Sequence, residues 1–157
     1  MSNIYDSLER RGYLPYEKYN ECDKISLKER GVVYRLELAR RLFVVKYQVD
    51  DYIIKEGTRC DKLILISLDS KQSEWIEIFV ELKGRDISHA IKQLESTIQN
   101  KIFQSDSVKK KFARVVARSF PSNRSDTRFE KKRIDFLKKY QCELKKQKSN
   151  GLDRIKI

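Results

Sequence analysis

The sequence has few of the residues that form disulfides or bind zinc, with three cysteines and one histidine among 157 residues. It also contains only two prolines. Cys22, Cys60 and Cys142 are odd in number, far apart and form no CxxC pair, which argues against a disulfide framework. His89 is the single histidine, so no Cys/His spacing suggests a zinc site. We expect reduced thiols, as in a cytoplasmic protein.

Long hydrophobic runs are also missing, and the longest have about four residues, as in Leu63–Ile66. No segment is therefore expected to span a membrane, and none resembles a signal peptide. The chain has no repeat, low-complexity tract or Pro/Gly-rich linker, which favours one domain over residues 1–157. Within it we predict an N-terminal extension at 1–25, a basic C-terminal helix at 125–145 and a flexible tail at 146–157.

Charge is abundant and unevenly distributed. The net charge is +12, and residues 101–157 carry all of it, with 18 Lys and Arg against 6 Asp and Glu. Such a surface attracts DNA or RNA because binding releases condensed counterions. An anionic membrane or an acidic protein would be attracted too, and a basic face can simply aid solubility.

Apolar periodicity outlines the secondary structure. Ser26 and Glu29 have capping-box spacing, which predicts a helix through Val32, Leu36 and Arg40. Alternating and β-branched residues then predict strands, and a stripe after Asp86 predicts a capped helix. The expected elements are a helix at 26–40, strands at 43–54, 61–68 and 75–83, a helix at 86–98, a strand at 112–119 and a helix at 128–145. This order predicts an α/β sandwich around a mixed sheet.

Three residues are candidates for chemistry: Asp61, which opens one predicted strand, and Glu81 and Lys83, which end the next. Side chains alternate along a strand, so Glu81 and Lys83 share a face. If the two strands pair antiparallel through the polar turn at 69–73, Asp61 comes opposite Glu81. Cross-strand side chains lie roughly 5 Å apart at Cβ, so the two carboxylates can hold one small hard cation.

Mg²⁺ is the expected cofactor, with Mn²⁺ as a substitute, because it prefers oxygen ligands and keeps waters for reaction. Asp61, Glu81 and the Leu82 carbonyl would bind it. Two adjacent carboxylates repel each other unless a cation or a proton lies between them. Lys83 would offset their charge, orient or deprotonate the attacking water and stabilise charge on phosphate.

These residues resemble the PD-(D/E)xK nuclease superfamily. Gly57-Thr-Arg-Cys-Asp61 is similar to the RecB-like segment before the metal-binding aspartate, and Glu81-Leu-Lys83 matches the (D/E)xK element. Gln93-Leu94 resembles the Gln-Leu motif of that branch, although Cys60 stands where many members have proline. The match covers residues 57–94. It implies a restriction endonuclease-like α-β-β-β-α-β core, metal binding by Asp61 and Glu81, and Lys83 as base or charge stabiliser.

Several assignments have a plain alternative. Glu-x-Lys triplets are common on exposed strands as ion-pair ladders, and only the surrounding pattern raises this one above them. Gln93 is placed near the metal or the scissile phosphate and His89 near substrate, but both would also suit a solvated helix edge. Glu37 is either an accessory ligand or a surface glutamate. Asp50 and Asp51 are interpreted as turn formers.

The basic segment offers a path for phosphates. Phe120 and Phe129 would stack on bases or belong to the core. The candidate contacts are Lys109, Lys110, Lys111, Arg114, Arg118, Arg124, Arg128, Lys131, Lys132 and Arg133.

The leading hypothesis is a metal-dependent nuclease that hydrolyses phosphodiester bonds, with DNA favoured as the substrate. An RNA-directed nuclease would differ only in substrate, and no residue of the sequence reports on a 2′-hydroxyl. The alternative is a catalytically silent nucleic-acid-binding module, or a nuclease subunit that needs a partner. The small size of the chain favours action as a homodimer or with a partner subunit.

Overall fold

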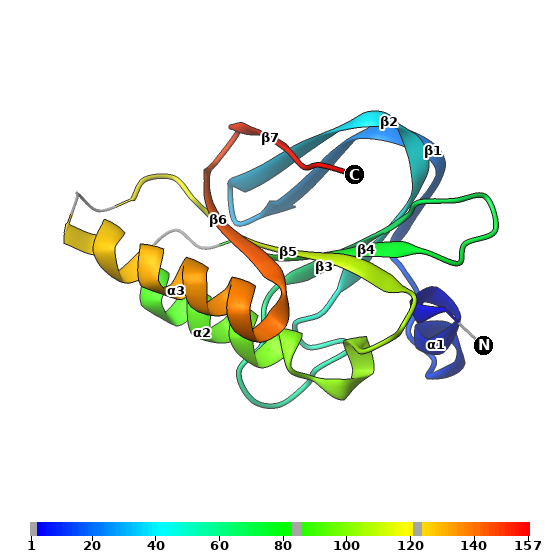
Figure 1. Ribbon diagram of the computed structural model, residues 1–157, viewed down its shortest axis with the longest axis horizontal. Helices are drawn as coiled ribbons and strands as arrows, with labels where there is room; N and C mark the ends of the chain where they lie inside the picture. The colour runs from blue at the N-terminus through cyan, green and yellow to red at the C-terminus, as the bar shows by residue number, and fades with distance from the viewer. Residues whose placement is uncertain (1–2, 83–85, 121–123) are drawn as a thin grey trace.

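The computed structural model describes residues 3–82, 86–120 and 124–157 (Figure 1). Within these residues the chain forms one mixed sheet with helices beside it. The elements are α1 (Ile4–Arg10), β1 (Glu17–Glu29), β2 (Val32–Gln48), β3 (Lys62–Ser67), β4 (Trp75–Leu82), α2 (Ile87–Ile98), the short 3₁₀ helix η1 (Lys101–Phe103), β5 (Val108–Ala117), α3 (Arg124–Tyr140), β6 (Cys142–Lys148) and β7 (Leu152–Arg154). This confirms the predicted α/β class with a mixed sheet.

The sheet joins an antiparallel part to a parallel part. Its strand order is β1-β2-β3-β4-β5-β6, and β7 pairs with the first half of β2. Strands β1 to β4 pair antiparallel, whereas β4, β5 and β6 pair parallel. Each parallel step requires a crossover, which α2 and α3 provide. The carboxyl ends of β4 and β5 and the N-termini of both helices therefore lie at one end of the sheet (Figure 1).

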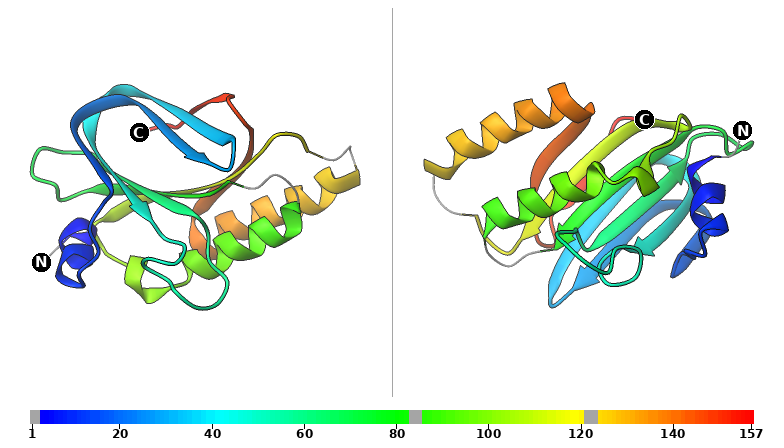
Figure 2. Two further views of the ribbon diagram at one scale, coloured as in Figure 1. Left: turned by 180° about the vertical axis from the view of Figure 1, so that it is seen from behind. Right: turned by 90° about the horizontal axis from the view of Figure 1, so that it is seen from below.

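Each face of the sheet carries its own core. On one face the helices α2 and α3 cover the helix-side core, which includes Leu63, Phe79 and Leu94. On the other face the long β1–β2 hairpin bends over the sheet and covers the hairpin-side core, which includes Ile64, Ile78 and Leu36 (Figures 1 and 2). Strands β3 and β4 are buried along their whole length because both faces are covered.

The helix predicted at 26–40 is wrong, because these residues form the tip and arms of the β1–β2 hairpin. Arg30 and Gly31 form the turn, with φ of 49° and 79°, and positive φ at both central residues is typical of a tight hairpin turn. Buried residues alternate on both sides of it, as at Val32, Tyr34 and Leu36. The spacing that suggested a helix also fits a strand, and pairing decides between them.

The predictions for the central elements are confirmed with small boundary shifts. Strands β3 and β4 pair antiparallel, β5 contains residues 112–117 of the strand predicted at 112–119, and the Asp86 side chain caps α2 by accepting from the His89 N–H at 3.1 Å. The strand predicted to continue to residue 54 instead ends at Gln48.

The C-terminal predictions need correction. Helix α3 ends at Tyr140, so residues 142–148 are strand β6 rather than helix. The predicted flexible tail contains β7, in which Asp153 is buried. Among the described residues, no helix has both the length and the apolar character needed to cross a membrane.

Candidate active site at the shared end of β3 and β4

Asp61 lies directly before β3 and contacts the end of β4. Its Oδ2 accepts a hydrogen bond from the Leu82 N–H at 2.9 Å. The last paired residues of the two strands are Lys62 and Val80, so the antiparallel register continued by one step sets Asp61 opposite Glu81. The structure therefore brings Asp61, Glu81 and Leu82 together as the sequence predicted.

The Glu81 side chain belongs to the face that α2 covers. Phe79, two residues before it on β4, lies in the helix-side core, and side chains two apart on a strand share a face. Glu81 is only 1% exposed, whereas Asp61 is half-buried. One acid is thus partly open to solvent, and the other lies in the interior.

The electrostatic environment of Asp61 disfavours its ionised form. Burial raises the pKa of Asp61, and the carboxylates of Glu29 and Asp50 raise it further, against the opposing effects of the Leu82 N–H and the Lys62 ammonium. Burial also raises the pKa of the neighbouring Cys60 thiol, with Glu81 and Asp61 both adding to the shift. Negative charge is therefore concentrated where the two strands end.

Helix α2 fixes the segment that leads into Asp61. The Gln93 Nε2 donates to the Arg59 carbonyl at 3.0 Å, and the Cys60 N–H donates to Thr97 Oγ1 at 2.8 Å. The Gln93 Oε1 is buried and has no hydrogen-bond partner within the part of the chain that the structure describes. Gln93 therefore lies beside the site, where its side-chain amide donates to the Arg59 carbonyl, two residues before Asp61.

Sequence reasoning missed Glu29 and Lys62. The bent hairpin returns Glu29 to Lys62, and their charged groups lie 3.1 Å apart, next to Asp61 in the chain. Lys62 also hydrogen-bonds the Gln48 side chain. The capping-box spacing predicts that Glu29 caps a helix. Only the alternating apolar residues on either side of Arg30-Gly31 indicate that it belongs to a hairpin instead.

Asp50 also lies nearer to the site than its interpretation as a turn former suggested. It forms an ion pair with Arg59 at 2.7 Å, and its N–H lies 3.3 Å from the Asp61 carbonyl. Lys83, the predicted base, falls outside the described residues. Over the described ranges, no group of three or more His, Cys, Asp or Glu side chains is arranged to hold a metal ion.

The two accessory candidates lie elsewhere. Glu37 is on β2, eleven residues before Gln48, and pairs with Arg154 at 3.1 Å. Of its two interpretations, this contact favours the surface glutamate, because its carboxylate is paired with Arg154 on β7. His89 is exposed in the first turn of α2, where its backbone N–H meets the Asp86 cap.

The predicted basic path divides into separate groups. Lys109, Lys110 and Lys111 stand near the start of β5, which is the opposite end of the sheet from Asp61. Arg118 is exposed after β5 and donates to the Arg30 carbonyl at 3.0 Å. Of the predicted contacts on α3, Arg128, Lys131 and Lys132 are exposed, and Arg133 is half-buried and paired to Glu130. Lys138 and Lys139 in the last turn of α3 are exposed as well. The side chain of Arg124 lies outside the described residues.

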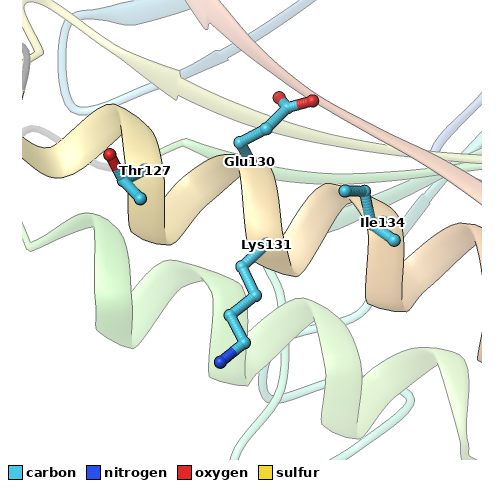
Figure 3. A pocket seen from close by; sticks show the side chains of 4 residues that line it. All are labelled: Thr127, Glu130, Lys131 and Ile134. Atoms are coloured by element: carbon cyan, nitrogen blue, oxygen red, sulfur yellow. The ribbon is translucent and has the colours of Figure 1, made fainter.

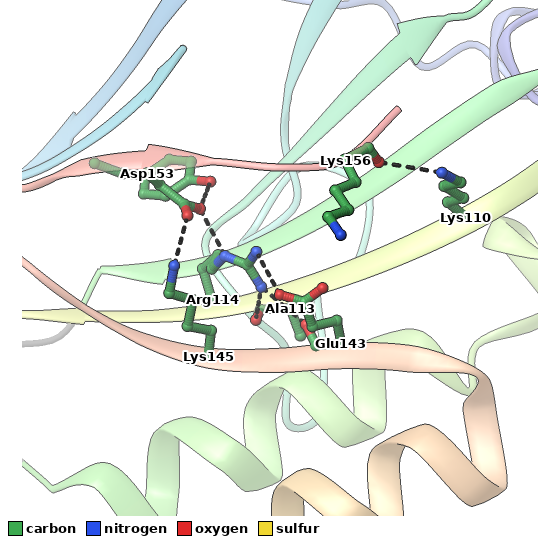
Figure 4. Close-up of polar contacts among 8 residues, drawn as sticks. Lys110, Ala113, Arg114, Glu143, Lys145, Asp153 and Lys156 are labelled. Atoms are coloured by element: carbon green, nitrogen blue, oxygen red, sulfur yellow. Dashed lines mark hydrogen bonds and ion pairs between the residues drawn. The ribbon is translucent and has the colours of Figure 1, made fainter. Parts of the chain in front are cut away.

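Arg114 is a correction, because its side chain is fully buried and cannot contact a phosphate at the surface. Its Nε donates to Asp153 Oδ2 at 2.7 Å, and its NH1 donates to the Glu143 carbonyl at 2.9 Å (Figure 4). Asp153 also accepts from the Tyr34 hydroxyl at 2.6 Å and from Lys145 at 3.2 Å. Arg114 therefore ties the C-terminal strand β7 to β2, β5 and β6.

Two phenylalanines and a shallow depression near α3 are separate from the candidate active site. Phe129 is buried and Phe120 half-buried, and the Lys146 ammonium lies 4.9 Å and 5.5 Å from their ring centroids. Phe129 thus belongs to the core, as its alternative interpretation held. A shallow depression on α3 is lined by Thr127, Glu130, Lys131 and Ile134 (Figure 3).

The chain matches no protein-family model, no curated protein and no solved structure.

Proposed function

We propose that this protein is a Mg²⁺-dependent nuclease that hydrolyses phosphodiester bonds in nucleic acid, DNA in preference to RNA. The observation that carries the proposal is the junction of β3 and β4, where Leu82 donates to Asp61 at 2.9 Å and the register sets Asp61 opposite Glu81. The order β2-β3-β4-α2-β5 supports it, because it follows the strand, strand, strand, helix, strand sequence of the restriction endonuclease-like core.

The donor set fits a small hard cation. Asp61, Glu81 and the Leu82 carbonyl are all oxygen ligands, which Mg²⁺ and Mn²⁺ prefer over sulfur or nitrogen. Burial is the main cause of the raised pKa of Asp61, and the nearby carboxylates of Glu29 and Asp50 add to it; a bound cation would offset both effects. When bound, the metal supplies Lewis-acid stabilisation of charge on phosphate and a template for the reacting groups.

The protein groups around the pair would orient it. The Leu82 N–H holds one oxygen of Asp61, so that carboxylate cannot rotate freely. Gln93 and Thr97 fix the two residues before it, which keeps the start of β3 against α2. Lys83 follows Leu82 in the chain, two residues after Glu81. It is proposed either to accept the proton of the attacking water as a neutral amine or, as a cation, to stabilise the charge that develops on phosphate.

Binding of the nucleic acid is assigned to the basic residues at the same end of the sheet. The N-terminus of α3 lies at the end where β4 and β5 finish (Figure 1). Arg128, Lys131 and Lys132 are exposed on this helix, where they can contact phosphates without an energetic cost for breaking buried pairs. The buried Arg114 is not part of this surface.

A cleavage assay tests the proposal. Purified protein is incubated with plasmid, single-stranded DNA and RNA, with Mg²⁺, Mn²⁺ or chelator. We expect metal-dependent cutting, and a loss of about a thousandfold or more in Asp61→Ala and Lys83→Ala, since each removes several kcal/mol of transition-state stabilisation. Glu37→Ala is the matched control, because it removes a carboxylate elsewhere on the sheet. Cutting that persists in both site variants would overturn the assignment.

The second candidate is a silent binding module or subunit. It is favoured by the basic face of α3, whose exposed side chains bind phosphate independently of Asp61 and Glu81. Its signature would be metal-independent binding of nucleic acid with no cutting by the wild-type protein.

A further inference from the structure

An exposed aromatic patch lies on the segments before β1 and after β2. Among the described residues, six large apolar side chains are exposed, and three of them belong to this patch. We define the Tyr16 patch as Leu14, Tyr16 and Tyr52, which are 59%, 46% and 37% exposed. A gathering of large apolar groups in water on a chain otherwise rich in charge marks a contact surface.

Two contacts restrain the Tyr52 ring of the patch. The Tyr52 hydroxyl accepts a hydrogen bond from the Leu14 N–H at 3.1 Å, which joins the two segments. The Tyr13 ring packs edge-on against the Tyr52 ring, with centroids 5.9 Å apart. Rings fixed in this way lose little further freedom when a ligand packs on them.

The patch is continuous with the candidate active site. Tyr52 belongs to the loop between β2 and β3, and this loop closes where the Val49 N–H donates to the Asp61 carbonyl at 2.9 Å. The Tyr16 ring centroid lies 5.2 Å from the Nζ of Lys62, the residue directly after Asp61. Tyr52 and Tyr16 are therefore each connected to Asp61, the first through the loop that closes at its carbonyl and the second through the adjacent Lys62.

Two lysines close to Tyr16, Lys62 and Lys46, already have charged partners. Lys62 is bound to Glu29 at 3.1 Å, and Lys46 is bound to Glu17 at 3.0 Å and to the Ser26 carbonyl at 2.7 Å. Both ammonium groups are almost fully buried. A ligand of the patch would thus meet ring faces and aliphatic surface rather than the ammonium groups of Lys46 and Lys62, whereas α3 carries exposed cations such as Arg128, Lys131 and Lys132.

We propose that the Tyr16 patch stacks the bases of an unpaired strand, and hence that the substrate is single-stranded nucleic acid or a duplex with an unpaired end. This inference rests on the proposed nuclease function, because proximity to Asp61 identifies the ligand. Every base has a π-face, so stacking on tyrosine is tolerant of sequence. Bases inside a duplex are already stacked on each other and cannot use the patch, while the basic face of α3 holds phosphates in either form.

Binding without cleavage tests the inference. Fluorescence anisotropy is measured for a labelled 20-nucleotide dT strand and for a blunt duplex of the same length, in chelator, at two salt concentrations. Tyr16→Ala and Tyr52→Ala should each weaken binding of the dT strand about tenfold and leave duplex binding unchanged. The loss should be the same at both salt concentrations, because no phosphate contact is removed. Tyr16→Phe, which keeps the ring, should bind like the wild type.

Leu152→Ala is the matched control, because Leu152 is 40% exposed but lies on β7, away from the patch. Equal losses on strand and duplex, or no loss in either tyrosine variant, would overturn the inference, and a protein partner would then be the remaining occupant. The cleavage assay separates the two proposals. If binding shows the tyrosine effect but the wild-type protein never cuts, the stacking surface is supported and the nuclease function is contradicted. If the protein cuts but shows no tyrosine effect, the nuclease function is supported and the stacking surface is contradicted.

Discussion

Asp61 is half-buried and Asp153 is buried, yet the surroundings of these two aspartates shift their pKa values in opposite directions. Burial alone would raise the pKa of Asp153, but the Arg114 charge and hydrogen bonds from Tyr34, Arg114 and Lys145 lower it. Burial raises the pKa of Asp61, and Glu29 and Asp50 add to the shift. Asp153 is a carboxylate that the fold has matched with donors, which is typical of structure. Asp61 is held in a state that favours a cation or a proton, which is typical of a functional site.

The largest expected effect is on stability, and it should separate the two aspartates. Asp153→Asn leaves the Arg114 guanidinium buried without its charged partner, which should lower the free energy of unfolding by about 3–5 kcal/mol. Asp61→Asn removes a charge that the folded state disfavours and should not destabilise the apo protein. Chemical denaturation at pH 7 measures both. Equal destabilisation by the two variants would remove the distinction between them.

The pH dependence of unfolding sharpens the same comparison. The raised pKa of Asp61 means that its contribution to stability is fully present below its ordinary value of 3.8 and is lost as the pH rises through the folded value. The lowered pKa of Asp153 means that its contribution is present above 3.8 and is lost as the pH falls through the folded value. The two Asn variants should therefore differ from the wild type in opposite pH ranges.

Glu77 tests whether a raised pKa is enough to mark a site. Burial raises its pKa to about 8, against the attraction of Lys111, and it lies four residues before Glu81 on β4. The wild type should lose about 1.4 kcal/mol of stability per pH unit between its ordinary pKa and the raised one, and Glu77→Gln should abolish that slope. Unfolding at pH 5 to 8 measures it, with the exposed Glu74→Gln as control. Loss of cleavage in Glu77→Gln would extend the site to this position.

Local patterns predicted the centre of the molecule well. Strands β3 and β4 and helix α2 follow from alternation, a polar turn and a capped apolar stripe, so the meeting of Asp61 and Glu81 could be derived from a single short hairpin. The (D/E)xK-like spacing on its own would not have given the raised pKa of Asp61, which depends first on burial and then on the carboxylates of Glu29 and Asp50.

The outer parts could not be predicted, because they depend on contacts between distant residues. The apolar spacing at 32–39 suits a helix and a strand equally, and only pairing with β1 selects the strand. Arg114 looked like one more cation of a basic run, and its burial depends on Asp153, 39 residues later. Glu29 reaches the site only because the hairpin bends back to Lys62.

The smallest expected effect comes from Glu37. Its partner Arg154 is 70% exposed, so Glu37→Gln should change the free energy of unfolding by less than about 0.5 kcal/mol. Cleavage should also be unchanged, because Glu37 is far along β2 from the strand ends. A large loss of cutting with unchanged stability would restore Glu37 as a functional residue.

Titration with Mn²⁺ tests whether a cation binds at the β3–β4 junction in the absence of substrate. The electron paramagnetic resonance signal of the free ion measures the uptake. The wild type and Glu37→Gln should take up the ion saturably, and Asp61→Asn should lose that uptake while remaining folded. Equal uptake by Asp61→Asn and wild type, or none by the wild type, would contradict a metal centre built on Asp61 and Glu81.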